Sequence, residues 1–401
     1  MPIDSIPIAP DVTDHPLPGN PSVRLALDEA IAASPNSAIT FADYMAICLD
    51  HPVGGYYRQA ERRPGRSGDF LTAPEAHPFF GIALAQQVVE MWERRGRPAP
   101  FTIREHGTGT GLRAWDLLAG IDDRSPELRS VLTYDLIESN PHRQHEAAAA
   151  FAEAGLDTIV RTVDAALPQT PSIGVVIANE LVDALPTHRL RWTGTAFEEA
   201  WVTRTGDRYV EQLGPLSAPV AAADPVAHLK HHGVILPAGA RIEYSPATSR
   251  WMQATADSIE RGYAIVIDYG YLAATLWRDH RLTGTLRAHR AHTVSDDPFA
   301  APGEEDLTAH VDFSLLQDAA IGAGMSVAGF TTQGAMLAGL GLGELLVRIG
   351  QDPSTTAAEY YAAQAAVMRL IDPGGMGRFG VLILAKDAPI DPPLAAFSVA
   401  L

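Results

Sequence analysis

The chain has 401 residues, of which 46% are hydrophobic and 19% are charged, so it can bury a large core and is neither mostly disordered nor collagen-like. Its formal net charge of −18 argues against broad binding to nucleic-acid phosphates, because that mode needs a basic surface. The single cysteine, Cys48, excludes an internal disulfide and a thiolate zinc site. No apolar run approaches the roughly 18 residues that a membrane span needs.

The first part of the chain divides into a tail and a helical segment. Residues 1–21 contain six prolines and three aspartates but neither arginine nor lysine. Because a secretory or transit peptide needs early positive charge, we expect a disordered Pro-rich tail on a cytoplasmic protein. Residues 22–98 are expected to form a helical segment. Within it, Thr40 followed by Asp43 is typical of a helix start, and an amphipathic helix is expected over 77–95.

From residue 101 onward, strands and helices alternate, which predicts an α/β fold with a mostly parallel sheet and helices on both faces. The predicted strands are 101–105, 131–137, 158–163, 174–178, 263–267, 325–331 and 379–385. The predicted helices are 112–119, 141–155, 314–323, 334–349 and 355–370, the last with Ser354 as its cap. This domain is expected to comprise 99–186 and 261–386, followed by a tail at 387–401.

Two stretches do not fit a simple strand–helix alternation. Residues 187–260 are too long for one crossover and are rich in β-formers, so they predict an inserted antiparallel subdomain. Its expected strands are 188–192, 199–203 and 208–211. Residues 271–312 are expected to be a long, loop-rich segment, and loops of that length inside a domain are usually functional.

The strongest chemical signal is Glu105-His-Gly-Thr-Gly-Thr-Gly111 at the end of the first predicted strand. Glycines at alternate positions let the chain turn sharply beside a ligand, and the N-terminus of the next helix favours negative charge. A dinucleotide fingerprint counted from Gly107 would need glycine where Leu112 stands, and no P-loop is present. The motif favours a nucleoside-cofactor site, although a tight turn for helix packing explains the glycines alone.

Acidic residues follow the next two predicted strands. Glu138 ends the second strand, where a carboxylate can accept hydrogen bonds from both hydroxyls of a ribose. Asp164 follows the third strand and either meets an adenine amino group or is an ordinary polar loop residue. Placed together with the glycine motif, Glu138 favours a nucleoside ligand.

Polar residues also follow the fourth and fifth strands. Asn179, Glu180 and Asp183 follow a buried apolar strand, and Asp268 ends the fifth. In open parallel sheets the ligand binds beyond the carboxyl ends of the strands, so these residues are expected to face the reacting group. The alternative is that Glu180 and Asp183 only cap a helix.

Several stretches together resemble the MidA-type family of class I methyltransferases over roughly residues 39–386. The stretches that carry the resemblance are 54–57, 68–75, 80–81, 105–111, 137–138, 178–186, 267–270, 284–287 and 306–313. The chain departs from the family pattern at His106 and Thr108 in the glycine loop, and at Leu181-Val182, where the family has an aromatic pair. In one interpretation that aromatic pair lines the acceptor pocket, so the sequence leaves the identity of the methyl acceptor open.

The resemblance implies a class I fold, S-adenosylmethionine as cofactor and protein arginine as the best-attested acceptor. The residues expected to bind the cofactor are Glu105, Gly107, Gly109, Gly111, Glu138 and Asp164, with Asp69 and Thr72 on a loop that folds over the cofactor. The residues expected to act on the acceptor are Glu180, Asp183, Asp268 and Asn179. Guanidinium is always charged, so carboxylates around it can localise its charge and receive the proton that methylation releases.

Partners and alternatives follow from the same residues. The expected partner is a protein substrate, with a respiratory-complex subunit and a homodimer as further expectations. One alternative keeps the cofactor but methylates a small molecule or peptide natural product, and another is an assembly chaperone that binds S-adenosylmethionine without turnover. His289, His292, His310 and Asp312 could in principle hold a metal, but their order fits no closed site, so no metal is expected and they are assigned to an acceptor-binding loop.

Overall fold

The computed structural model describes residues 18–59, 77–166, 169–278, 281–290 and 293–399. Asp69 and Thr72, the loop that carries them, His292 and most of the expected N-terminal tail lie outside the described residues. Within these ranges, no helix is both long enough and apolar enough to cross a bilayer.

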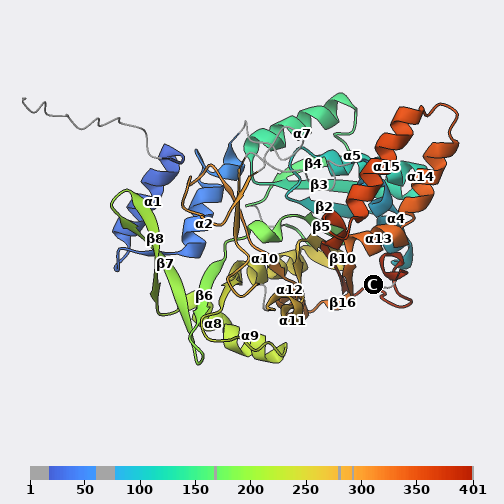
Figure 1. The fold of residues 1–401 in the computed structure, drawn as a ribbon. Coiled ribbons are helices and arrows are strands. Elements are labelled where there is room, and N and C mark those ends of the chain that lie inside the picture. The colour runs from blue at the N-terminus through green and yellow to red at the C-terminus, as the bar shows by residue number, and fades with distance from the viewer. Residues whose placement is uncertain (1–17, 60–76, 167–168, 279–280, 291–292, 400–401) are drawn as a thin grey trace, which may run out of the picture.

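A mixed seven-stranded sheet forms the centre of the described fold (Figure 1). Its strands, in spatial order, are β16 (Ser326–Thr332), β17 (Gly380–Lys386), β10 (Ile259–Asp268), β5 (Ser172–Asn179), β2 (Phe101–His106), β3 (Leu132–Glu138) and β4 (Val160–Asp164). Neighbouring strands from β10 to β4 are parallel, whereas β17 is antiparallel to both β10 and β16. This is the predicted α/β class, and each of the seven predicted strands is present.

The register aligns the ends of the strands that carry the expected site. His106 pairs with Ile137, and Glu138 pairs with Asp164. Asn179 pairs with Ile267, one residue before Asp268. Strands β5 and β10 are nearly continuous apolar runs because helices cover both faces of a parallel sheet. The polar residues that follow such runs therefore emerge together at one edge.

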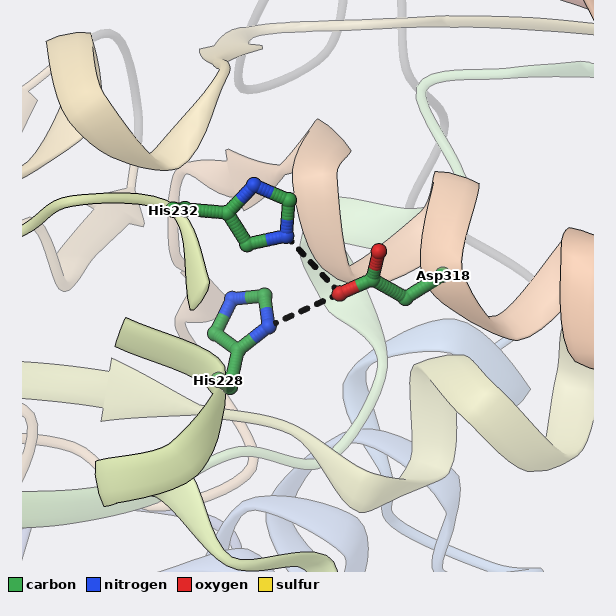
Figure 2. Close-up of side chains that lie close together, drawn as sticks. All are labelled: His228, His232 and Asp318. Atoms are coloured by element: carbon green, nitrogen blue, oxygen red, sulfur yellow. Dashed lines mark hydrogen bonds and ion pairs between the residues drawn. The ribbon is translucent and has the colours of Figure 1, made fainter. Parts of the chain in front are cut away.

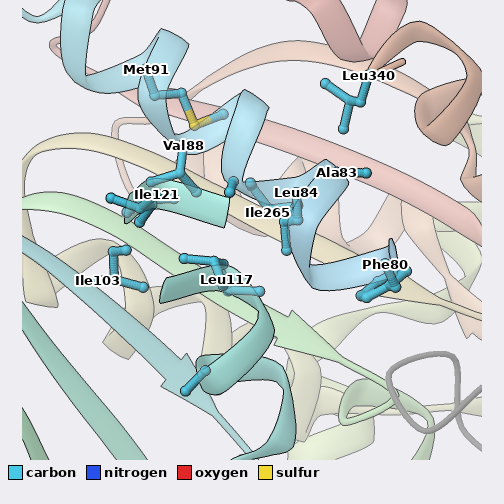
Figure 3. Packing of buried hydrophobic residues seen from close by; sticks show 14 of the residues in the cluster. Phe80, Ala83, Leu84, Val88, Met91, Ile103, Leu117, Ile121, Ile265 and Leu340 are labelled. Carbon is cyan, nitrogen blue, oxygen red and sulfur yellow. The ribbon is translucent and has the colours of Figure 1, made fainter. Parts of the chain in front are cut away.

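One face of the sheet is covered by helices whose apolar side chains form a large shared core (Figure 3). These helices are α4 (Phe79–Arg94), α5 (Leu112–Arg124), α6 (Pro126–Val131), α7 (Pro141–Glu153), α13 (Gln333–Gly339), α14 (Leu342–Gln351) and α15 (Ala357–Ile371). Leu84 and Val88 of α4 meet Leu117 of α5 over Ile103 and Ile265 of the sheet. The predicted apolar stripe of 77–95 is thus the inner face of α4.

The other face carries α10 (Pro246–Ser258) and α12 (Phe313–Gly322), which pack with each other. Buried apolar residues from both helices, among them Met252 and Leu316, pack on Val266 and Leu382 of the sheet. Helix α10 had not been predicted, because Trp251 and Met252 are its only large apolar residues among small and polar ones, so its periodicity is weak.

A second sheet lies beside the central one, on the left in Figure 1. Its strands are β1 (Ile39–Thr40), β6 (His188–Trp192), β7 (Phe197–Thr205), β8 (Arg208–Gly214) and β9 (Arg241–Tyr244), all antiparallel. The predicted strands of the insertion are therefore formed, and β1 joins them from the N-terminal segment. The helices that accompany this sheet are α1 (Pro21–Ala33), α2 (Phe41–Asp50), α8 (Ala218–Ala223) and α9 (Pro225–His231).

Two predictions of local structure were wrong, and a third was incomplete. The segment 271–312 is loop-rich as predicted, but it also contains short elements that were not predicted, namely β11 (Gly270–Tyr271), α11 (Ala273–Leu276), β12 (Arg287–Arg290), β13 (Thr293–Ser295), β14 (Asp306–Thr308) and β15 (Val311–Asp312). The single helix predicted at 334–349 is two helices, α13 and α14, because Gly341 adopts a φ of +80° between them. The cap of α15 is Thr356, which forms a capping box with Glu359, and not Ser354.

Candidate active site

A cavity of about 560 Å³ lies at the carboxyl ends of β2, β3 and β5. The loops that follow these strands form most of its wall. The lining residues used below are Asp50, Tyr57, His106, Gly107, Thr108, Gly109, Arg113, Glu138, Arg143, Ala165, Ala166, Gln169, Asn179, Glu180, Leu181 and Trp251. A cleft beyond the strand ends is where an open α/β sheet is expected to bind its ligand.

The glycine loop forms one side of this cavity. Gly107, Gly109 and Gly111 all have positive φ, at +65°, +59° and +79°, which side chains other than glycine rarely adopt. A Cβ at Gly107 would lie 2.9 Å from Leu181 Cδ1, and one at Gly111 would lie 3.0 Å from Phe151 Cε2. A Cβ at Gly109 would meet no atom within 4 Å. Gly109 is therefore the point at which bare backbone faces the open cavity, whereas Gly111 makes room for α7.

Glu138 is buried at the cavity wall and holds the glycine loop in place. Its Oε2 accepts a hydrogen bond of 2.9 Å from the Gly109 N–H, and its Oε1 accepts from the N–H groups of Ser139 and Asn140, each at 2.9 Å. A carboxylate has about four acceptor positions, so Glu138 keeps capacity toward the cavity. The structure therefore combines a loop anchor with an acceptor suited to a ribose hydroxyl.

Glu105 is fully buried and is not among the cavity-lining residues. Tyr134 donates a 2.6 Å hydrogen bond to its Oε2, and Arg113 of α5 lies 3.4 Å from its Oε1. Because Arg113 does line the cavity, Glu105 acts on the site through this ion pair and by fixing the start of the glycine loop. Burial raises the pKa of the Tyr134 hydroxyl well above its usual value, so it remains a donor.

The loop after β5 brings Asn179 and Glu180 to the opposite wall. The Asn179 amide donates to Glu180 Oε1 at 3.0 Å, and Glu180 N–H donates to Ile267 O at 2.9 Å. Glu180 has a φ of +50°, a strained conformation that is found at functional sites when the surroundings enforce it. Among the described residues, the buried Asn179 Oδ1 has no hydrogen-bond partner. A ligand that donates a hydrogen bond here would satisfy it.

Asp268 and Asp183 lie beneath this loop, outside the main cavity. Asp268 Oδ2 accepts from the backbone N–H groups of Leu181 at 3.2 Å, Val182 at 2.9 Å and Asp183 at 3.3 Å. Burial, followed by repulsion from Asp183 and Glu180, raises the pKa of Asp268 well above its usual value. Burial also raises the pKa of Asp183 to about 6, although a hydrogen bond from Tyr269 opposes the shift. Asp268 thus anchors the loop that carries Glu180, and Asp183 is part of that loop.

Asp164 does not line the cavity, which agrees with the alternative that it is an ordinary polar loop residue. Asp164 is exposed and accepts a 2.9 Å hydrogen bond from Ala166 N–H, so it caps its own loop. The residues of this loop that line the cavity are Ala165, Ala166 and Gln169. Asp164 itself is not among them.

Many of the lining residues were not predicted as site residues. Asp50 and Tyr57 come from the N-terminal segment, at the end of α2 and in a 3₁₀ turn (Tyr56–Arg58). The Tyr57 hydroxyl donates a 2.6 Å hydrogen bond to Asp306 of β14, and its carbonyl accepts from Asn140. The Gly-Gly-Tyr-Tyr stretch had pointed to the family but not to a role for Tyr57.

His106 and Trp251 are two further lining residues that were not predicted as site residues. His106 is partly buried, and burial followed by the charge of Arg104 lowers its pKa to about 4. Its ring is therefore neutral at physiological pH. The rings of His106 and Trp251 lie 5.9 Å apart, edge to face. Trp251 is on α10, a helix that the sequence had not predicted, and no motif marked it.

Among the described residues, the histidines and the aspartate that were assigned to an acceptor-binding loop lie in or next to different elements. His289 lies in β12, whereas Asp312 caps α12 by accepting from Ser314 and Leu315 N–H groups. His310 lies between β14 and β15, with its ring 5.8 Å from that of Tyr269. These positions belong to the small sheets beside the cavity.

The residues present fit a nucleoside cofactor. Bare backbone at Gly109 leaves room for a ligand, Glu138 offers acceptor capacity, and the buried Asn179 Oδ1 awaits a donor. Residues 83–331 match the model of a family whose description reads "Putative S-adenosyl-L-methionine-dependent methyltransferase". The match contains the whole glycine loop and the Asn179–Asp183 stretch.

Curated relatives and solved structures agree with this match. The chain is 30% identical over 305 residues to the mitochondrial protein arginine methyltransferase NDUFAF7 homolog of Drosophila melanogaster, across 70% of this chain and 66% of the relative. It is 26% identical over 393 residues to the protein arginine methyltransferase NDUFAF7 of Xenopus tropicalis, across 90% and 86%. A Burkholderia thailandensis crystal structure bound to S-adenosyl-homocysteine superposes with a TM-score of 0.80 at 32% identity, across 95% of this chain and 98% of that one.

Proposed function

The chain belongs to this family of S-adenosyl-L-methionine-dependent methyltransferases, and we propose that its methyl acceptor is an arginine side chain of a protein. Two observations support arginine as the methyl acceptor. The curated relatives are named protein arginine methyltransferases, and the cavity presents the Glu180 carboxylate beside the glycine loop. The observation that carries the proposal is Glu180, held in a strained conformation at the carboxyl end of β5.

The cofactor supplies an electrophilic methyl group on a sulfonium. Gly109 and Glu138 would hold its nucleoside, and the buried Asn179 Oδ1 suits a donor on the ligand. Holding donor and acceptor in a fixed geometry can supply on the order of 7–11 kcal/mol of the barrier. The rigid loop after β5, anchored on Asp268, provides such fixed positioning for Glu180.

Glu180 would act on a guanidinium in two ways. This cation has five N–H donors and no free lone pair, so nothing on it attacks a methyl group while its charge stays delocalised. A carboxylate that accepts a hydrogen bond from one nitrogen draws positive charge toward itself and leaves another nitrogen more nucleophilic. The same carboxylate can take the proton that leaves as the new C–N bond forms.

The test is transfer of a radiolabelled methyl group to proteins of the native cell lysate, with Glu180→Gln as the critical variant. This variant keeps the side-chain shape but removes the charge, so we expect turnover to fall at least tenfold, or about 1.4 kcal/mol, with cofactor affinity near that of the parent protein. Glu153→Gln, an exposed position near the end of α7, is the matched control. Unchanged turnover in Glu180→Gln would remove Glu180 from the reaction.

The same assay separates the acceptor classes. Label in protein that yields methylarginine on acid hydrolysis supports the proposal. Label in the small-molecule fraction favours a natural-product methyltransferase, and cofactor binding with no transferred label favours a chaperone. The family resemblance leads us to propose a respiratory-complex subunit as the protein acceptor, and mass spectrometry of the labelled proteins tests that identity.

A further inference from the structure

A cluster of two imidazoles and one carboxylate lies at the contact between α9 and α12, outside the cofactor cavity (Figure 2). His228 Nδ1 lies 3.1 Å from Asp318 Oδ2, and His232 Nε2 lies 2.8 Å from the same oxygen. One ligand atom from each residue lies within 4.8 Å of the others. Figure 2 shows both rings directed at one carboxylate oxygen.

The backbone explains why these groups converge. His228 is on α9 and His232 is its C-terminal cap, so the two residues are one helical turn apart and share a face. Asp318 is on α12, whose Leu315 packs in the same apolar cluster as Leu229 of α9. Ligands from two helices therefore meet because the helices are packed together, not because a flexible loop places them.

The ligand set has the chemistry of a zinc site. Imidazole nitrogen and carboxylate oxygen bind Zn²⁺ at roughly 2.0–2.2 Å, so two ligand atoms of a tetrahedral site lie about 3.4 Å apart. To reach this spacing, the separations of 3.1 and 2.8 Å would open by about 0.3 and 0.6 Å, while all three ligand atoms already lie within 4.8 Å of one another. Mg²⁺ and Ca²⁺ prefer all-oxygen ligand sets, so two nitrogen ligands select against them.

A second observation comes from the other nitrogen of His228. Its Nε2 lies 3.0 Å from Asp312 Oδ2, while Asp312 Oδ1 accepts from the Ser314 and Leu315 N–H groups at 2.9 and 3.2 Å. A histidine ligand to a metal usually donates its remaining N–H to such a carboxylate, which fixes the ring orientation. His228 is thus held with Nδ1 facing Asp318 and His232.

We propose that His228 Nδ1, His232 Nε2 and an Asp318 carboxylate oxygen bind one Zn²⁺ ion that clamps α9 to α12. The His232 and Asp318 side chains are 21% and 36% exposed, so a metal can enter from solvent and a water can occupy the fourth position. None of the three residues lines the cofactor cavity. The ion therefore stabilises the contact between the inserted segment and the methyltransferase sheet and takes no part in methyl transfer. Without metal, protons on the imidazole nitrogens bridge the same gaps.

The experiment titrates chelator-treated full-length protein with ZnCl₂ by calorimetry and follows its melting temperature. We expect one equivalent of Zn²⁺ to bind and to raise the melting temperature. His232→Gln and Asp318→Asn change partly exposed ligands, so both variants should fold but lose the site. Asp312→Asn keeps the helix cap and should weaken zinc affinity about 10–100-fold. His231→Gln, on the exposed neighbouring histidine, is the control and should bind as the parent protein does.

Binding of S-adenosyl-homocysteine shows whether each variant is folded, since these residues lie outside the cofactor cavity. Co²⁺ provides an independent readout, because four-coordinate Co²⁺ with nitrogen ligands gives visible d–d bands that His232→Gln should abolish. The proposal is overturned if the parent protein binds no zinc. It is equally overturned if His232→Gln and Asp318→Asn, both folded, bind zinc as tightly as the parent. Either outcome is separate from the identity of the methyl acceptor.

Discussion

Replacement of Gly109 by alanine separates the role of bare backbone in ligand binding from its role in folding. Gly109 has a φ of +59°, and a Cβ there would meet no atom within 4 Å. The folded protein should therefore lose only the cost of a left-handed alanine, about 1–2 kcal/mol. The new methyl group would enter the cavity beside the Glu138 hydrogen bond, so we expect the affinity for S-adenosyl-homocysteine to fall at least tenfold, or about 1.4 kcal/mol.

Gly155 is the matched control for this substitution. It lies just beyond the end of α7, has a φ of +71°, and would also meet no atom within 4 Å if it carried a Cβ. Gly155→Ala should therefore lose the same 1–2 kcal/mol of unfolding free energy, measured by urea denaturation, while calorimetry finds unchanged ligand affinity. Our reasoning fails if Gly109→Ala binds the ligand as tightly as the parent, or if Gly155→Ala loses affinity to the same extent.

Three further predictions concern the groups around the cavity. Glu138→Gln places an amide N–H donor against either the Gly109 N–H or the Ser139 and Asn140 N–H groups, which now donate to Glu138. The unfolding free energy should therefore fall by about 1.5–3 kcal/mol, and ligand affinity should fall more than tenfold. Asp268→Asn replaces the anchor of the Glu180 loop and should lower turnover more than ligand affinity, as steady-state kinetics and calorimetry can show. Acidification from pH 7 to pH 5 should destabilise the protein through His106, by at most about 2 kcal/mol, in urea denaturation curves.

The sign of the pH effect follows from the direction of the shift. The pKa of His106 is about 4 in the folded protein and 6.5 when unperturbed, so the unfolded chain binds a proton more readily between these values. The stability that a neutral His106 contributes is present above pH 6.5 and is lost as the pH falls toward 4. His106→Gln should flatten this dependence. Unchanged ligand affinity in Glu138→Gln would contradict the first prediction. Equal losses of turnover and ligand affinity in Asp268→Asn would contradict the second. An equally steep dependence of stability on pH in His106→Gln would contradict the third.

Much of the fold could be predicted because its signals are local. Apolar runs bounded by glycine and polar residues predicted the seven strands of the central sheet, and the helix predicted at 141–155 corresponds to α7. Helices α8 to α10 were missed because they are short or rich in small and polar residues, so they depend on the sheets that they contact. The break at Gly341 was missed because glycine is compatible with either a helix interior or a left-handed turn.

The structure brings some of the expected site residues together and separates others. Gly107, Gly109, Glu138, Asn179 and Glu180 line one cavity because the parallel register brings the strand ends together. The sequence could not show which acidic side chains would line the cavity and which would be buried beside it.

Glu105 illustrates the reason. Strand β2 is buried on both faces, so it has no alternation from which to assign the side chain. Asp268 binds three N–H groups of a loop 85–87 residues away, a contact that no local pattern reveals. The cluster of His228, His232 and Asp318 was missed for the same reason, since about 90 residues separate its two parts.

The wall that the N-terminal segment contributes has a practical consequence for work on excised fragments. Asn140 donates to the Tyr57 carbonyl, the Tyr57 hydroxyl donates to Asp306, and Arg58 donates to the Ser139 carbonyl. A recombinant fragment limited to residues 83–331 would lose these three hydrogen bonds, two of which bind the residues just before α7. Such a fragment would lack the part of the cavity wall that Asp50 and Tyr57 form. Weak ligand binding by the fragment would therefore not measure the affinity of the intact enzyme.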